Sequence, residues 1–144
     1  MIIVDTGGLI ATIDRSSRLH QAARALLDAE RDKSVASLLI SPFVLAEVDY
    51  LVAERLRRPD IALEVLRDIE RGAYCLEPFS AADVARAREV IEHYADQQIG
   101  LADASNVVLA ERHNTHDILT TDQRHFRVLQ GPRGRPFRIL PADR

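Results

Sequence analysis

The chain has 144 residues, 47% of them hydrophobic, and a net charge of −3, a size and balance that predict one compact domain over residues 1–144. The single cysteine, Cys75, excludes an internal disulfide, and no apolar stretch is long enough to span a bilayer. The first residues enter a strand-like segment rather than a signal peptide, so we expect a soluble cytoplasmic protein.

Strand-like and helix-like segments alternate along the chain. Short apolar runs predict strands at residues 2–4, 38–40, 73–76, 117–121 and 137–140. Apolar residues at helical spacing, bounded by Ser, Pro or Gly, predict helices over residues 17–32, 42–57, 59–72, 80–94 and 101–113. We expect Ser16 or Ser17 to cap the first of these helices and Ser80 to cap the fourth.

Strands that are separated by helices need crossover connections, which favour parallel pairing and place helices on both faces of a sheet. The predicted fold class is therefore α/β, with three α/β/α layers around a mostly parallel central sheet of about five short strands.

Two acidic residues directly follow predicted strands. Asp5 ends the first strand, before Gly7 and Gly8, and Asp122 ends the strand at 117–121. Either residue alone is typical of a helix cap or a turn. Because ligands of open parallel sheets bind beyond the carboxyl ends of the strands, the pair together indicates a possible site.

Two further acids lie on predicted helices. Glu47 has apolar neighbours on its helix face, so we expect its charge to need a partner. Asp49 has equally apolar neighbours, and helical spacing does not choose between the two. Asp103 lies in the first turn of the helix at 101–113, where capping alone explains an acid.

Converging carboxylates without basic partners repel one another unless a divalent cation supplies positive charge. Ligation by oxygen alone suits Mg²⁺ or Mn²⁺ better than zinc. The chemistry typical of such a site is phosphodiester hydrolysis.

Four segments carry a resemblance to a known family. They are I-I-V-D-T at residues 2–6, S-P-F-V-L-A-E-V at 41–48, G-L-A-D-A-S at 100–105 and L-T-T-D-Q-R-H-F at 119–126. In order and spacing they resemble the PIN-domain ribonucleases and, among these, the VapC-type toxins of bacterial toxin–antitoxin pairs. The resemblance spans nearly the whole chain.

This resemblance implies a PIN-like metal-dependent ribonuclease in which a water molecule attacks phosphorus in line and leaves a 5′-phosphate and a 3′-hydroxyl. It selects Glu47 over Asp49. The implied catalytic residues are Asp5, Glu47, Asp103 and Asp122. The implied ligands of Mg²⁺ or Mn²⁺ are chiefly Asp5 and Asp103, with Thr6 and Thr121 orienting ligands or water.

The implied partners are an RNA substrate, a small antitoxin protein whose basic residue enters the acidic site, and a second copy of the chain. Two alternatives remain: a non-catalytic PIN-like interaction protein, and an RNA-processing PIN nuclease that is not a toxin. Six arginines follow Asp122 and indicate either a phosphate track or a solvated tail: Arg124, Arg127, Arg133, Arg135, Arg138 and Arg144.

Other site classes fit poorly. A phosphatase of the haloacid dehalogenase type needs an acid two residues after Asp5, where Gly7 stands. A receiver domain needs a lysine near a late strand, and the single lysine, Lys33, is remote from any such strand. No phosphate-binding loop motif occurs. His113 and His116 are assigned no role, and Cys75 is expected to be a small core side chain.

Overall fold

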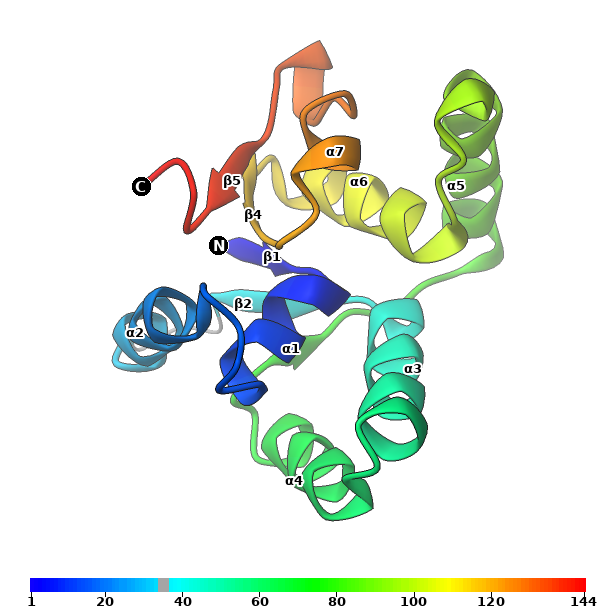
Figure 1. Ribbon diagram of the computed structural model, residues 1–144. Coiled ribbons are helices and arrows are strands. Elements are labelled where there is room, and N and C mark those ends of the chain that lie inside the picture. The colour runs from blue at the N-terminus through cyan, green and yellow to red at the C-terminus, as the bar shows by residue number, and fades with distance from the viewer. Residues whose placement is uncertain (34–36) are drawn as a thin grey trace.

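The computed structural model describes residues 1–33 and 37–144, and these form a five-stranded parallel sheet in the order β3-β2-β1-β4-β5 (Figure 1). The strands are β1 (Ile2–Val4), β2 (Leu38–Ile40), β3 (Cys75–Leu76), β4 (Asp117–Leu119) and β5 (Arg138–Leu140). The predicted parallel sheet is confirmed. β1, the first strand in the chain, lies at its centre.

Helices cover both faces of this sheet (Figure 1). The α-helices are α1 (Thr6–Ile13), α2 (His20–Arg31), α3 (Pro42–Tyr50), α4 (Pro59–Glu70), α5 (Ala81–His93), α6 (Leu101–His113) and α7 (Gln123–Phe126). A π-helical segment, η1 (Leu51–Arg55), continues α3, and the short 3₁₀ turns are η2 (Ala95–Gln97) and η3 (Pro132–Gly134). The described part of the chain has no helix long and apolar enough to cross a membrane.

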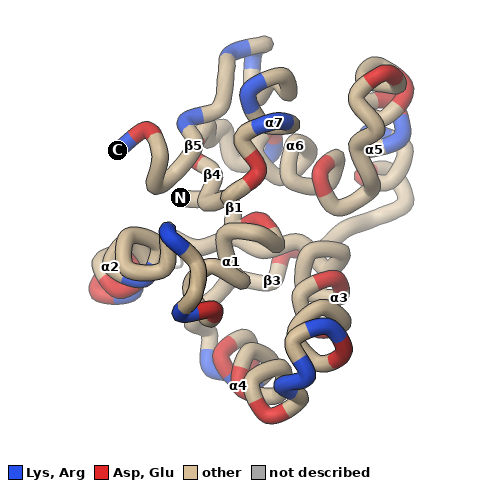
Figure 2. Tube along the Cα trace, viewed as in Figure 1, with Lys and Arg blue, Asp and Glu red and all other residues tan. Residues whose placement is uncertain are grey.

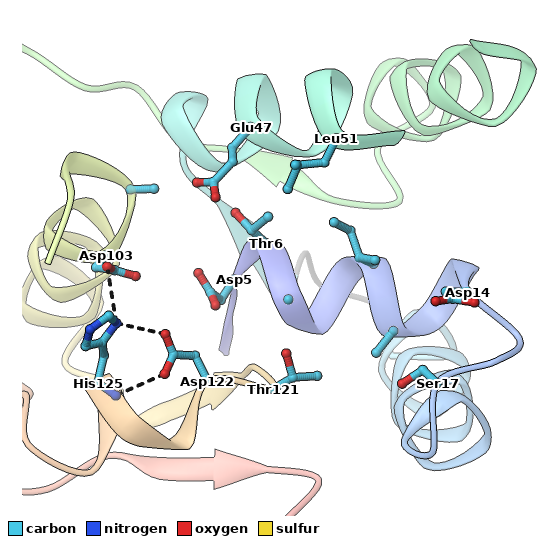
Figure 3. Close-up of a pocket in the computed structure, with 14 residues that line it drawn as sticks. Asp5, Thr6, Asp14, Ser17, Glu47, Leu51, Asp103, Thr121, Asp122 and His125 are labelled. Carbon is cyan, nitrogen blue, oxygen red and sulfur yellow. Dashed lines mark hydrogen bonds and ion pairs between the residues drawn. The ribbon is translucent and has the colours of Figure 1, made fainter. Parts of the chain in front are cut away.

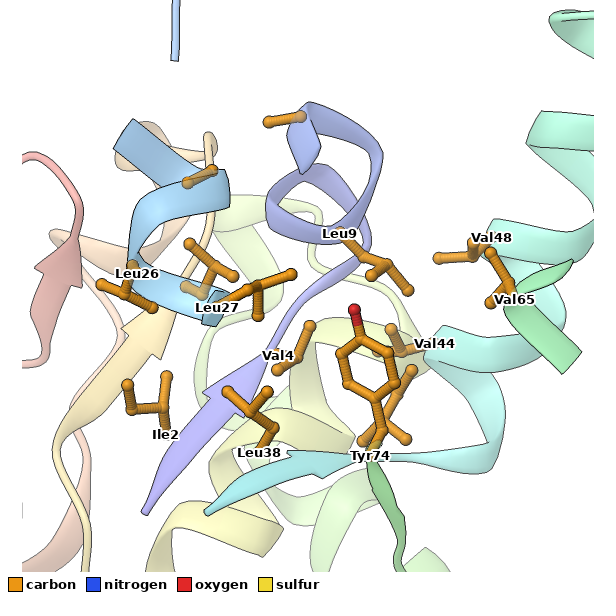
Figure 4. Packing of buried hydrophobic residues seen from close by; sticks show 14 of the residues in the cluster. Ile2, Val4, Leu9, Leu26, Leu27, Leu38, Val44, Val48, Val65 and Tyr74 are labelled. Atoms are coloured by element: carbon orange, nitrogen blue, oxygen red, sulfur yellow. The ribbon is translucent and has the colours of Figure 1, made fainter. Parts of the chain in front are cut away.

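Alternating side chains of each strand divide the core into two layers. Ile2 and Val4 pack with residues of α1, α2, α3 and α4 in one cluster (Figure 4). Ile3, which points to the opposite face, packs with residues of α5 and α6 in the other cluster. The three-layer α/β/α architecture predicted from the sequence is therefore confirmed.

Helix α1 is absent from our sequence prediction, which assigned no element to Gly7 and Gly8. Both glycines lie in the first turns of this helix, which packs against the end of β4. A Cβ atom on Gly8 would lie 2.1 Å from the carbonyl oxygen of Leu119, and one on Gly7 would lie 2.3 Å from Thr121 Oγ1. The glycines therefore permit a close helix-strand contact that outweighs their low helix propensity.

Of the two predicted helix caps, one is wrong and one is confirmed. Helix α2 begins at His20, with Leu19 at its N-cap and no side-chain cap, so the predicted cap by Ser16 or Ser17 is wrong. The Ser16 hydroxyl instead donates to Asp14 in the preceding turn. The predicted Ser80 cap is confirmed, because Ser80 and Asp83 form a reciprocal capping box at the start of α5.

Candidate active site

A pocket of about 510 Å³ opens at the carboxyl ends of β1 and β4. All four acids predicted from the sequence line it: Asp5, Glu47, Asp103 and Asp122 (Figure 3). Asp5 directly follows β1, Glu47 and Asp103 lie on α3 and α6, and Asp122 lies in the loop before α7. Acidic segments from both halves of the molecule therefore meet here (Figure 2). Neither Lys nor Arg lines the pocket within the residues that the structure describes.

Asp5 is the deepest of these acids and is 5% exposed. Its Oδ1 atom accepts a hydrogen bond from Asn106 Nδ2 at 2.9 Å, and its Oδ2 atom accepts one from Thr120 Oγ1 at 2.7 Å. Burial raises the pKa of Asp5 to about 6, and the nearby charges of Asp103 and Glu47 add to the rise against the lowering effect of the Thr120 bond. This carboxylate is held in place but not neutralised.

Asp103 lies in the first turn of α6 and is only partly buried. Its Oδ2 atom accepts a hydrogen bond from the backbone N–H of Gly100 at 3.2 Å, so the expected capping role is present. Burial raises the pKa of Asp103, and the charge of Asp122 raises it further, whereas the Gly100 N–H and His125 lower it. Asp103 therefore both caps α6 and lines the pocket.

Asp122 is the N-cap residue of α7, and His125 contacts both of its carboxylate oxygens. The backbone N–H of His125 donates to Oδ1 at 3.0 Å, and His125 Nδ1 lies 2.8 Å from Oδ2. The same Nδ1 lies 3.8 Å from Asp103 Oδ2. Our sequence analysis missed His125, although its place three residues after an N-cap acid puts the two side chains on one helical turn.

Glu47 lies at the edge of the pocket beside Thr6 (Figure 3) and is exposed to solvent. The expectation that its charge needs a partner is therefore wrong, because its helix face is not covered here. Asp49, on the same helix, is also exposed but is not among the residues that line the pocket. The geometry thus agrees with the choice of Glu47.

The hydroxyl residues of the pocket differ in their contacts. Thr6 is 6% exposed, and its Oγ1 atom has no hydrogen-bond partner among the described residues. Thr121 lines the pocket but is exposed, and the residue that contacts Asp5 is its neighbour Thr120. Thr120 Oγ1 also accepts the backbone N–H of Asp122 at 2.9 Å, so one hydroxyl connects two of the acids.

Buried polar residues also join the helices that carry Glu47 and Asp103. Ser41, the N-cap of α3, and Ser105 of α6 are both fully buried, and their hydroxyl oxygens lie 2.7 Å apart. This contact fixes the start of α3 against α6. The spacing of the acids is therefore set by side-chain contacts as well as by the sheet.

The donor set of the pocket fits a hard divalent cation. Ligand atoms of Asp103, Asp122 and His125 lie within 4.8 Å of one another, and Asp5 lines the same pocket. Burial raises the pKa of both Asp5 and Asp103, and a neighbouring acid raises each further, so a bound cation would stabilise their charged forms. The buried Thr6 hydroxyl beside them has no hydrogen-bond partner among the described residues.

Comparisons with known proteins give the same family as the sequence motifs. The PIN domain family matches residues 2–131. Ribonuclease VapC26 of Mycobacterium tuberculosis (strain ATCC 25618 / H37Rv) is 42% identical over 140 residues, which cover 97% of this chain and 100% of that protein.

A solved structure also has this fold. The crystal structure of Mycobacterium tuberculosis VapC20, described as a Sarcin-Ricin loop cleaving toxin, matches with a TM-score of 0.71 and 19% identity. The match covers 86% of this chain and 92% of that one. From the family match and the identity to VapC26, the chain belongs to the PIN-domain family, among its VapC-type ribonucleases.

Proposed function

We propose that this protein is a divalent-metal-dependent ribonuclease that hydrolyses phosphodiester bonds of RNA and acts in the cytoplasm as the toxin of a toxin–antitoxin pair. The observation that supports this proposal most directly is the meeting of Asp5, Glu47, Asp103 and Asp122 in one pocket that Lys and Arg do not line in the described chain. A PIN-like protein that only bound partners would have no need of four acids in one place.

Asp5 and Asp103 would hold Mg²⁺ or Mn²⁺ in this pocket. When bound, the ion would stabilise negative charge on the phosphoryl group and lower the pKa of a nearby water. Glu47, the exposed acid at the edge of the pocket, would orient that water and accept its proton. Asp122, whose two oxygens both contact His125, would act through water or by holding a second ion.

Fewer of the arginines after Asp122 are free to bind phosphate than the sequence indicated. Arg127 pairs with Asp143, and Arg138 pairs with Asp117, so the charges of both are already partly balanced. Arg124 lies on α7 beside the pocket residue His125 and is exposed. We propose that Arg124 contacts RNA phosphates next to the cleaved bond.

The proposed protein partners are a small antitoxin and a second copy of this chain. Helix α4 and the turn before it leave large apolar side chains exposed, which is typical of a surface covered by another protein. These side chains are Leu56, Leu63 and Leu66. A strict monomer by size-exclusion chromatography with light scattering at micromolar concentration would contradict the homodimer.

The test of the proposed activity is cleavage of total RNA by the purified protein with Mg²⁺ or Mn²⁺, beside an EDTA control. Glu47→Gln should abolish most of the cleavage. Asp49→Asn is the matched control, since it neutralises an exposed acid on the same helix outside the pocket. Metal-independent cleavage, or equal loss in both variants, would contradict the proposal, and mapping the new ends tests for a 5′-phosphate.

A further inference from the structure

Asn106 is a fully buried polar residue that lies one helical turn after Asp103 on α6. It reaches across to the residue that follows β1, where its Nδ2 donates to Asp5 Oδ1 at 2.9 Å. A carboxylate can only accept here, so the amide nitrogen of Asn106 must be the atom that faces Asp5. The contact joins the carboxyl end of β1, where Asp5 lies, to the helix that carries Asp103.

The other end of the Asn106 amide is unsatisfied. Its Oδ1 atom is buried and accepts no hydrogen bond from the described residues. Burying an unpaired carbonyl carries a desolvation cost that an apolar side chain of similar shape, such as leucine, would avoid. The hydrogen bond to Asp5, rather than apolar packing, therefore explains an asparagine at this position.

We propose that Asn106 is a positioning residue, which fixes the Asp5 carboxylate relative to Asp103 for metal binding. This inference rests on the proposed metal-dependent function. Thr120 holds the second oxygen of Asp5, so two donors from different elements set the plane of the carboxylate. The Asn106 amide is uncharged and orients Asp5 without neutralising it, whereas Lys or Arg at this position would replace the cation.

The test compares the substitutions Asn106→Leu and Thr12→Val. Thr12 is a matched control because it is buried and donates to the Leu9 carbonyl at 2.6 Å, but does not line the acidic pocket. Binding of Mn²⁺ is measured by calorimetry and by the electron paramagnetic resonance signal of the free ion. Thermal unfolding is measured in EDTA.

Asn106→Leu should bind Mn²⁺ about 10- to 100-fold more weakly and lower kcat by a similar factor with little change in KM for RNA. Its Tm in EDTA should be close to that of Thr12→Val, because each substitution removes one buried side-chain hydrogen bond, and Thr12→Val should bind Mn²⁺ like wild type. Asn106→Ala should show the same loss of metal affinity. Because alanine cannot overpack the core, this variant keeps the test valid if Asn106→Leu does not fold.

Wild-type Mn²⁺ affinity in either folded Asn106 variant would overturn this inference but not the proposed function. An equal loss of affinity in Thr12→Val would also overturn it, because the effect would then be one of general destabilisation. A wild-type protein that bound no Mn²⁺ would overturn the proposed function, and this inference with it.

Discussion

The two ends of helix α6 both contact a buried carboxylate, but the charges around the two acids are opposite. At the N-terminal end, Asp5 has Asp103 and Glu47 for neighbours, and its pKa is raised to about 6, chiefly by burial. At the C-terminal end, Glu77 is 7% exposed, yet its pKa is lowered.

The lowered pKa of Glu77 has a clear cause. Burial alone would raise it, but hydrogen bonds from His113 and Arg112 outweigh that effect. His113 Nε2 lies 2.7 Å from Glu77 Oε2, and Arg112 donates to the same oxygen at 3.1 Å and to Asp83 at 2.7 Å. His113, which the sequence analysis left without a role, thus stabilises the fold.

This comparison shows that burial of an acid does not by itself mark a functional site. The charge of the neighbouring side chains marks the site, because a carboxylate that already has cationic partners has little affinity left for a metal. The acids at the N-terminal end of α6 have like-charged neighbours, and they are the ones that we expect to bind a metal.

The largest expected difference between the two ends is in activity. Asp103→Asn should lower the rate of RNA cleavage about 1000-fold, the effect of losing several kcal/mol of charge stabilisation. Glu77→Gln, at the other end of the helix, should leave cleavage by the folded protein near the wild-type rate. Initial rates on one RNA substrate at saturating Mn²⁺ measure both, and comparable losses in the two variants would contradict the distinction.

The second expected difference is in stability, and the two ends should respond with opposite sign. Asp5→Asn should raise the free energy of unfolding by about 1–3 kcal/mol at pH 7.5, because it removes a buried charge. Glu77→Gln should lower it by about 2 kcal/mol, since it breaks a buried ion pair whose cations stay partly solvated. Urea denaturation in EDTA measures both changes.

The pH dependence of the unfolding free energy provides a control for the Asp5→Asn and Glu77→Gln variants. The folded state holds the Asp5 proton up to about pH 6, so the stability associated with Asp5 is greatest below the unfolded pKa near 4 and is lost as pH rises to 6. The contribution of Glu77 is present above pH 4.5 and is lost as pH falls below it. A stabilising effect of Asp5→Asn that persisted unchanged at pH 4 would contradict this assignment.

The smallest expected effects concern Asp122, which combines features of both ends: it lies in the pocket but already contacts His125. Asp122→Ala should lower stability by about 1 kcal/mol through loss of the α7 cap, and Asp122→Asn should retain most of it. Both should lower cleavage only about tenfold. Thermal unfolding and cleavage rates check this, and a loss as large as that of Asp103→Asn would make Asp122 a direct metal ligand.

Much of the fold could be predicted from the sequence. The apolar runs of the strands and the strong signals at Pro42, Pro59, Gly72 and Ser80 depend on local spacing and local hydrogen bonds. Helix α1 could not be predicted, because its glycines are favoured by contact with β4, more than 100 residues away. Helix α7 is only four residues long and gives no period to detect.

The acids of the candidate site were predictable because each lies at an element boundary or in a motif. Their supporting residues were harder to find. Thr120, Asn106 and His125 act through hydrogen bonds, two of which connect residues over 100 positions apart. The remaining local signal was the pair Ser105 and Asn106, two polar residues in an otherwise apolar stretch of helix, both of which proved to be fully buried.

The central position of β1 also affects when the pocket can form during protein synthesis. Ile3 pairs with Leu39 on one side and with Ile118 on the other, so the sheet is incomplete until the ribosome has made β4. Synthesis from Asp5 to Asp122 takes on the order of 10 s. A growing chain therefore remains without its full set of acids while it is beside ribosomal and messenger RNA, and the antitoxin that we propose would have that interval in which to meet it.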